Sequence, residues 1–204
     1  MGSKRDIRQI DLRHARNATA DHLGELRAYL AQLIGEPFRF ARVSYGDELT
    51  LHFGDLRPAH SPKLKGKKYG TYILGVRGSP WVLKPGAESL VLTSGISFDE
   101  LPSGLGKPTR KEEFEANPHI VPETRVLSGE PFVVRPVSAF GLHLRTSDGS
   151  ALLILPTGSE DELDAQTIPE VALADWELIS PAGLLSAGPG LNWSFQPSPV
   201  PKPS

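Results

Sequence analysis

The sequence predicts a mainly β protein of the α+β kind, with antiparallel sheets arranged as a barrel or a sandwich and one N-terminal amphipathic helix. Short segments in which apolar and polar residues alternate recur along the chain, and turn residues separate them. The chain has 20 glycines and 19 prolines, an abundance that favours many short elements joined by turns. Only one segment carries apolar residues at the period of a long helix, so strands dominate the prediction.

The clearest strand pattern lies in residues 140–155, FGLHLRTSDGSALLIL. Two leucines alternate there with His143 and Arg145, a Ser-Asp-Gly-Ser turn follows, and an apolar run returns. Alternation on one arm and a polar turn before the other are typical of a β-hairpin.

The predicted helix begins after Thr19, whose hydroxyl is suited to cap the first turn. Gly35 and Pro37 end it, because glycine favours helix termination and proline cannot continue a helix. The apolar face, which we expect to lie against a sheet, consists of Leu23, Leu26, Leu30, Leu33 and Ile34.

Strands are predicted on both sides of a long, weakly patterned middle segment. Before it they are residues 38–45, 48–53, 69–76, 81–83 and 88–93, and after it residues 132–140, the hairpin, 174–179 and 191–195. Trp81, Trp176 and Trp193 each lie in an apolar strand near a turn, so we expect them to anchor the core.

These patterns divide the chain into five parts. They are a polar N-terminal arm (1–18), a helix with a first β unit (19–95), a loop-rich connection (96–131), a second β unit (132–196) and a disordered Pro-rich tail (197–204). Each β unit contains a strand, LTLHF or LHLR, that holds His52 or His143 among alternating leucines. Two similar β units would explain this likeness, although the register differs by one residue.

The bulk composition excludes several classes of function. A net charge of −2 gives no overall positive field, so any binding of nucleic acid would have to be local. The absence of cysteine excludes disulfides and thiolate chemistry. The charged N-terminal residues lack the apolar core of a signal peptide, and no apolar run approaches the ~20 residues of a membrane span. We therefore expect a soluble, cytoplasmic protein that does not bind membranes.

The six histidines are the first candidates for metal or acid–base chemistry. None of them has the His-x-His or His-x-x-x-His spacing that brings two ligands together locally. His52 and His143 alternate with leucines, so we expect each to face solvent on the side of its strand away from the core. A metal site shared by these two histidines is the alternative. No cofactor is predicted.

The densest positive charge lies just before the strand predicted at 69–76. Lysines on a loop beside a tyrosine could hold phosphates and stack a base. Lysine-rich loops also keep β proteins soluble and discourage edge pairing, so both interpretations stay open. The candidate anion-binding residues are Arg57, His60, Lys63, Lys65, Lys67, Lys68 and Tyr69.

Catalytic signatures are lacking in the sequence. A phosphate loop would need glycine at position 101 and serine or threonine at 108, where the chain has Leu101 and Pro108. There is no GxSxG motif, so no catalytic residue is assigned from sequence.

Three functions stay open. The first is a noncatalytic binding or interaction module, most simply for another protein, with variable loops on a stable sheet scaffold. The second is a hydrolase or nucleic-acid-processing enzyme whose residues converge only in space, with His52, His60, Lys67 and His143 as candidates. The third is a nucleic-acid or phosphate binder that uses the lysine segment.

Overall fold

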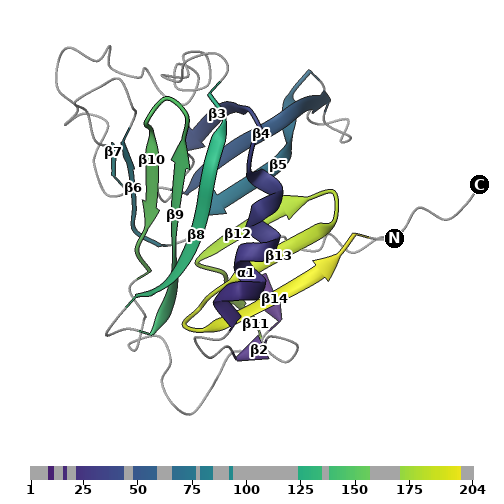
Figure 1. Ribbon diagram of the computed structural model, residues 1–204. Coiled ribbons are helices and arrows are strands. Elements are labelled where there is room, and N and C mark those ends of the chain that lie inside the picture. Colours follow the sequence, from purple (N-terminus) through teal and green to yellow (C-terminus); the bar gives the residue numbers. More distant parts are fainter. Residues whose placement is uncertain are drawn as a thin grey trace, which may run out of the picture.

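The computed structural model describes residues 9–11, 16–17, 22–43, 48–58, 66–76, 79–84, 92–93, 124–134, 138–156 and 171–198. Within these ranges the strands form a seven-stranded sheet, a five-stranded sheet and a small two-stranded sheet, and every pairing is antiparallel (Figure 1). Neither large sheet closes on itself in the part described. The predicted mainly β class with antiparallel sheets and one N-terminal helix is confirmed, in its open two-sheet form.

The seven-stranded sheet has a strand order that mixes distant parts of the chain. In order it contains β2 (Arg16–Asn17), β14 (Asn192–Pro197), β13 (Gly183–Ala187), β12 (Trp176–Ser180), β5 (Lys68–Val76), β4 (Leu49–Pro58) and β3 (Phe38–Val43). The five-stranded sheet contains β7 (Leu92–Thr93), β6 (Trp81–Lys84), β10 (Ala151–Ile154), β9 (Ala139–Thr146) and β8 (Val126–Val134). The remaining pair is β1 (Gln9–Asp11) with β11 (Val171–Leu173).

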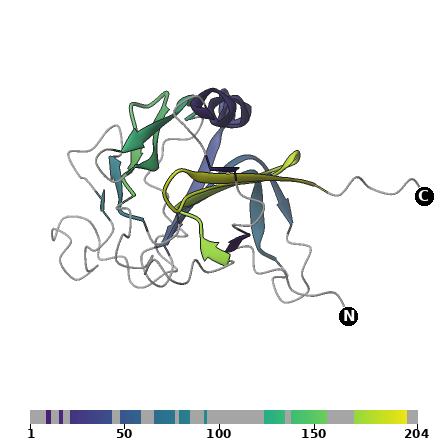
Figure 2. The same cartoon turned by 90° about the horizontal axis from the view of Figure 1, so that it is seen from below.

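Helix α1 (Leu23–Leu30) and the five-stranded sheet form one layer over the seven-stranded sheet (Figure 2). The helix packs along β8, and its Arg27 Nε donates a 2.7 Å hydrogen bond to Glu130 Oε2 on that strand. On its other side, Tyr29 stacks on Phe195 of β14 with ring centroids 4.3 Å apart. The helix thus connects the two sheets and covers the edge strand β8, which would otherwise offer backbone groups for pairing.

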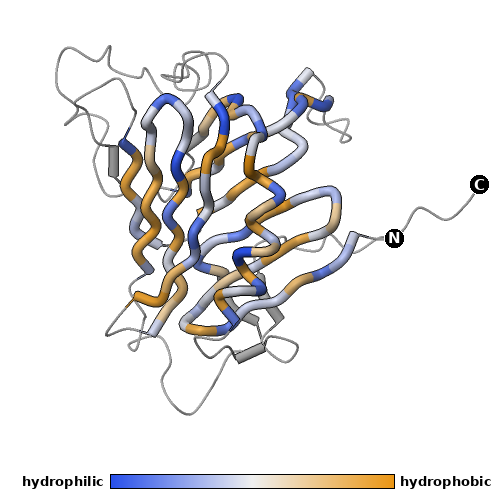
Figure 3. The backbone as a smooth tube through the Cα atoms, in the orientation of Figure 1, coloured by the Kyte–Doolittle hydropathy of each residue, from blue (hydrophilic) through white to orange (hydrophobic). Residues whose placement is uncertain are grey.

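One hydrophobic core lies between the layers. The alternating residues Leu51 and Phe53 of β4 and Leu142 and Leu144 of β9 all belong to it. Hydrophobic residues accordingly follow the strands of both sheets in Figure 3. The three tryptophans are at most 4% exposed, which confirms their predicted role as core anchors. Trp176 also links the layers, because its indole N–H donates to the carbonyl of Phe140 at 2.9 Å.

The leucine face of the helix is buried, with Leu26, Leu30 and Leu33 at 0% exposure. The prediction for Ile34 was wrong, because its side chain is 55% exposed. A 3-10 turn, η2 (Ala31–Leu33), follows α1, and Ile34 then takes an extended conformation with ψ 127°. The 3.6-residue period therefore stops before Ile34. The predicted capping residue, Thr19, lies outside the described residues.

Strand pairing crosses the boundary between the two predicted β units. β5 pairs with β12, and β6 pairs with β10, so each large sheet contains strands from both units. The two histidine-bearing segments with similar sequences are β4 and β9, which lie in different sheets. The division into two β units stays a prediction, since the strand pairings do not divide the structure at the boundary between these units.

Strands of the structure lie within two segments that were predicted as a loop-rich connection and a polar arm. β8 begins at Val126, inside the predicted loop-rich connection, and Pro131 lies within this strand opposite Leu142. An edge strand tolerates proline, because one row of its N–H groups is not needed for pairing. In the predicted N-terminal arm, β1 and β2 each pair with a strand near the C-terminus. The final residues of the predicted tail, 199–204, lie outside the described part. No helix within the described ranges is long and apolar enough to cross a membrane.

Candidate anion-binding surface

A β-bulge sets the direction of the hairpin that carries the predicted cations. β4 and β5 pair regularly from Leu49 to Phe53, and the register then shifts before Leu56 pairs with Gly70. Gly54, in the bulge, has a φ of +76°, which few residues other than glycine adopt. A side chain at position 70 would overlap backbone atoms of Phe53, so glycine is needed there for the strands to approach. A bulge of this kind bends the strand and changes the direction of the residues beyond it.

Side chains from both neighbouring strands hold the bulge in place. Arg39 Nε on β3 donates to the carbonyl of Gly54 at 2.7 Å, and Thr71 Oγ1 on β5 donates to the carbonyl of Asp55 at 3.1 Å. The carbonyls freed by the register shift are therefore hydrogen-bonded. Beyond the bulge, residues 55–58 and 66–68 are all exposed, so this end of the hairpin extends from the body of the protein.

The exposed hairpin end places cations from both strands together. Arg57 is paired with Tyr69 across the strands, Pro58 is paired with Lys68, and Lys67 precedes Lys68. One nearby acidic group is Asp55, whose side chain is 90% exposed and lies 3.8 Å from Arg39. The other three candidates, His60, Lys63 and Lys65, lie outside the described residues. Three predicted anion-binding cations are therefore placed at one end of the hairpin.

Three aromatic rings form a row beside these cations. Phe40 of β3 stacks on His52 of β4 with ring centroids 4.2 Å apart and planes 25° apart. The His52 ring is in turn 5.6 Å from the ring of Tyr69 on β5. Phe40 and Tyr69 are half-buried, and the row lies on the face of the sheet away from the core because its members alternate with core residues. We call Phe40, His52 and Tyr69 the aromatic row.

Sequence reasoning missed Phe40, because regular alternation in Phe-Arg-Phe puts both phenylalanines on one face, whereas Phe38 is in the core and Phe40 stacks on His52. Its position opposite His52 depends on the register between β3 and β4, which shifts between Phe38 and Phe40. No local pattern specifies that register.

The prediction that His52 faces solvent was wrong in one respect. It points away from the core as expected, but it is only 1% exposed because of the groups around it, including the stacked ring of Phe40. Its Nδ1 accepts a 3.2 Å hydrogen bond from the N–H of Gly70. Because Nδ1 accepts this hydrogen bond, the proton of the neutral His52 ring lies on Nε2. The ring is therefore fixed in orientation by a backbone group.

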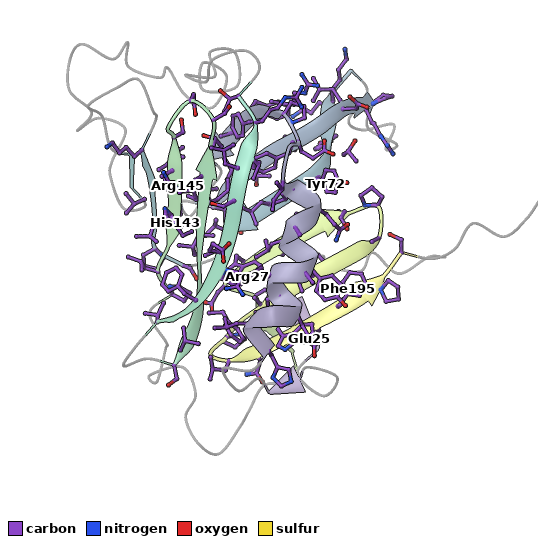
Figure 4. The ribbon with its side chains drawn as sticks, viewed as in Figure 1. Glu25, Arg27, Tyr72, His143, Arg145 and Phe195 are labelled. Atoms are coloured by element: carbon purple, nitrogen blue, oxygen red, sulfur yellow. The ribbon has the colours of Figure 1, made fainter. Side chains whose placement is uncertain are left out.

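The structure does not bring His52 and His143 together. Both alternate with leucines of the same core, but one lies on the seven-stranded sheet and the other on the five-stranded sheet, so they face opposite sides of the molecule. Figure 4 shows His143 beside Arg145 on the five-stranded sheet. Among the described residues, no three His, Asp or Glu side chains are grouped so as to hold a metal ion. The predicted cluster of His52, His60, Lys67 and His143 is not assembled by the three members that the structure describes.

A cavity of about 20 Å³ lies between the sheets, lined by residues that include Leu51, Leu83 and Leu144. That volume accommodates about one water molecule, whereas sites for organic ligands are usually hundreds of Å³. The cavity is therefore too small for an organic ligand, and the hairpin surface is the stronger candidate for binding.

A further unusual polar group among the described residues is Asp175, which precedes β12. Its Oδ1 accepts a 2.9 Å hydrogen bond from Ser79 Oγ, and its Oδ2 is buried with no hydrogen-bond partner. Burial raises the pKa of this carboxyl group to about 6, and the hydrogen bond from Ser79 only partly opposes the increase. Because Ser79 lies just before β6, this hydrogen bond joins the two layers.

Comparison with protein-family models, with curated proteins and with solved structures gives no match for this chain. A function is therefore inferred from the residues of the chain itself.

Proposed function

We propose that the protein is a soluble, noncatalytic binding module that holds an anionic ligand on the hairpin cations and the aromatic row. The observation that carries this proposal is the position of Arg57, Lys67 and Lys68 at one exposed hairpin end, where Arg57 is paired with Tyr69, the last of three neighbouring rings. Exposed cations attract an anionic ligand, and aromatic faces add a contact that depends on the shape of the ligand.

The local charge supports binding at this place in a chain whose net charge is −2. From residue 57 to residue 68 the sequence holds five Lys or Arg and no Asp or Glu. An overall field would not attract polyanions, so the hairpin is the region where they would bind. Another protein, the simplest partner predicted from sequence, fits this surface if it presents an acidic segment.

Retention on immobilised heparin, a general polyanion, tests the proposal. The double variant Lys67→Gln/Lys68→Gln should elute at lower salt than the wild type, because it removes two of the three placed cations. The control Lys84→Gln/Arg145→Gln removes two exposed cations from the five-stranded sheet and changes the net charge equally. It should elute with the wild type. Equal shifts for both variants, or no retention of the wild type, would contradict the proposal.

A further inference from the structure

We infer that the anionic ligand is single-stranded nucleic acid, with its phosphates on the hairpin cations and its bases stacked against the rings of Phe40 and Tyr69. This inference rests on the proposed function, since it names the ligand class of the same surface. It depends on the combination of the two features, because neither cations nor rings alone identify a nucleic acid.

The cations provide the contact with phosphate. Arg57 is paired with Tyr69 and shares its face of the hairpin end, whereas Lys68, one residue away, lies on the opposite face, and Lys67 precedes it. A flexible polyanion with a regular spacing of charges can contact all three if it passes around the exposed hairpin end. Such contacts release counterions and give affinity without sequence preference.

The aromatic row provides the contact that an acidic peptide could not use. Every base has a flat π-face, and bases stack on aromatic side chains with little dependence on sequence. Aspartate and glutamate side chains have no such face. Tyr69 belongs to both features, because its ring is in the row and its backbone pairs with Arg57. A nucleotide on Tyr69 would therefore have a cation beside its phosphate.

The row is also preorganised. The Gly70 N–H holds the ring of His52, and this ring is stacked at 4.2 Å on Phe40. Rings that are already fixed lose little conformational entropy when a base stacks on them. In a duplex the base faces are covered by neighbouring pairs, so this surface favours a single strand over the duplex of the same sequence.

Fluorescence anisotropy with a labelled oligothymidylate of about 12 nucleotides tests the inference, a length within the usual site size of such surfaces. The wild type should bind it more tightly than the matching duplex or an oligoglutamate peptide of similar charge. With three phosphate contacts, the logarithm of the association constant should fall with the logarithm of salt concentration with a slope of about −2. The variant Lys67→Gln/Lys68→Gln should reduce this slope to about −0.7.

Substitutions in the row separate stacking from charge. Tyr69→Leu and Phe40→Leu should each weaken oligothymidylate binding by roughly 5- to 150-fold, the range expected for loss of one stacked base. Tyr69→Phe keeps the ring and should bind like the wild type. Circular dichroism and thermal melting of each variant establish that the fold is intact. Tyr69→Phe and Tyr69→Leu both lack the hydroxyl group, and only Tyr69→Phe keeps an aromatic ring.

Each outcome distinguishes the inference from the proposed function. Retention on heparin together with preference for oligoglutamate over oligothymidylate would overturn the inference and leave an acidic protein segment as the ligand. Equal binding by folded Tyr69→Leu, Phe40→Leu and wild type would show charge contacts without stacking, and would also overturn it. If the wild type is not retained on heparin, both the inference and the proposed function are overturned.

Discussion

Replacement of Asp175 by asparagine should make the stability of the protein less dependent on pH. The pKa of this carboxyl group is raised from 3.8 to about 6 because burial disfavours the charged form. The folded state therefore binds the proton more tightly than the unfolded state does. The resulting stabilisation is complete below pH 3.8 and is lost as the pH rises through 6. A pKa raised by this amount corresponds to about 3 kcal/mol, at about 1.4 kcal/mol per pH unit.

The structure explains why the charged form is unfavourable. Oδ1 has one hydrogen bond, from Ser79, and Oδ2 is buried without a partner. No charged side chain among the described residues contributes to the change in pKa. Ionisation above pH 6 therefore leaves a poorly compensated charge between the two layers. Asparagine has nearly the same shape and no charge at any pH.

Urea denaturation of the wild type and Asp175→Asn at several values between pH 4 and pH 8 measures the effect. Other groups titrate equally in both proteins, so they cancel in the difference between the two free energies of unfolding. This difference should shift in favour of the variant by up to about 3 kcal/mol between pH 4 and pH 8. Asp55→Asn, at a side chain that is 90% exposed, is the matched control for an Asp-to-Asn change. A difference for Asp175→Asn that stays constant across this range would refute the reasoning.

Two further substitutions test the core and the bulge. Leu30→Ala should lower the free energy of unfolding by about 2–5 kcal/mol, since Leu30 is fully buried between helix and sheets. The control Leu127→Ala, at a side chain that is 58% exposed, should have a much smaller effect. Equal losses of the two variants in urea denaturation would contradict the described core. Gly70→Ala should destabilise the protein by more than about 1 kcal/mol, because the added Cβ overlaps the backbone of Phe53. It should also weaken heparin retention by moving the hairpin end, and an unchanged elution position in a destabilised variant would show that the bulge does not direct the cations.

Much of the fold could be predicted because its signals are local. Alternation identified β4 and β9, and the leucine period identified the helix face, since both patterns arise from the geometry of a single element. The predictions failed at the ends of elements, where the local pattern changes. Ile34 is exposed because a 3-10 turn ends the helix early, and β8 begins within a Pro-rich segment because an edge strand tolerates proline.

The order of strands was not predictable for a related reason. β5 is bonded to β4, its neighbour in sequence, on one side, and to β12, about a hundred residues later, on the other. Alternation specifies which face of a strand is buried, but it does not specify the partner. Strand order therefore depends on the packing of the whole core.

The candidate surface consists of the hairpin cations, which the sequence predicted, and the aromatic row, which it did not predict as a unit. The cations were visible in sequence because Lys67 and Lys68 are adjacent, and the pairing of β4 with β5 keeps Arg57 close to them. The aromatic row was not, since it needs three strands in a particular register, with a bulge that places Tyr69 near His52. Chance could produce a cluster of lysines on a solvated loop, whereas three neighbouring rings require positions set by three separate strands. The row therefore carries more of the functional argument than the charges do, and the ring substitutions test it more sharply than the lysine substitutions.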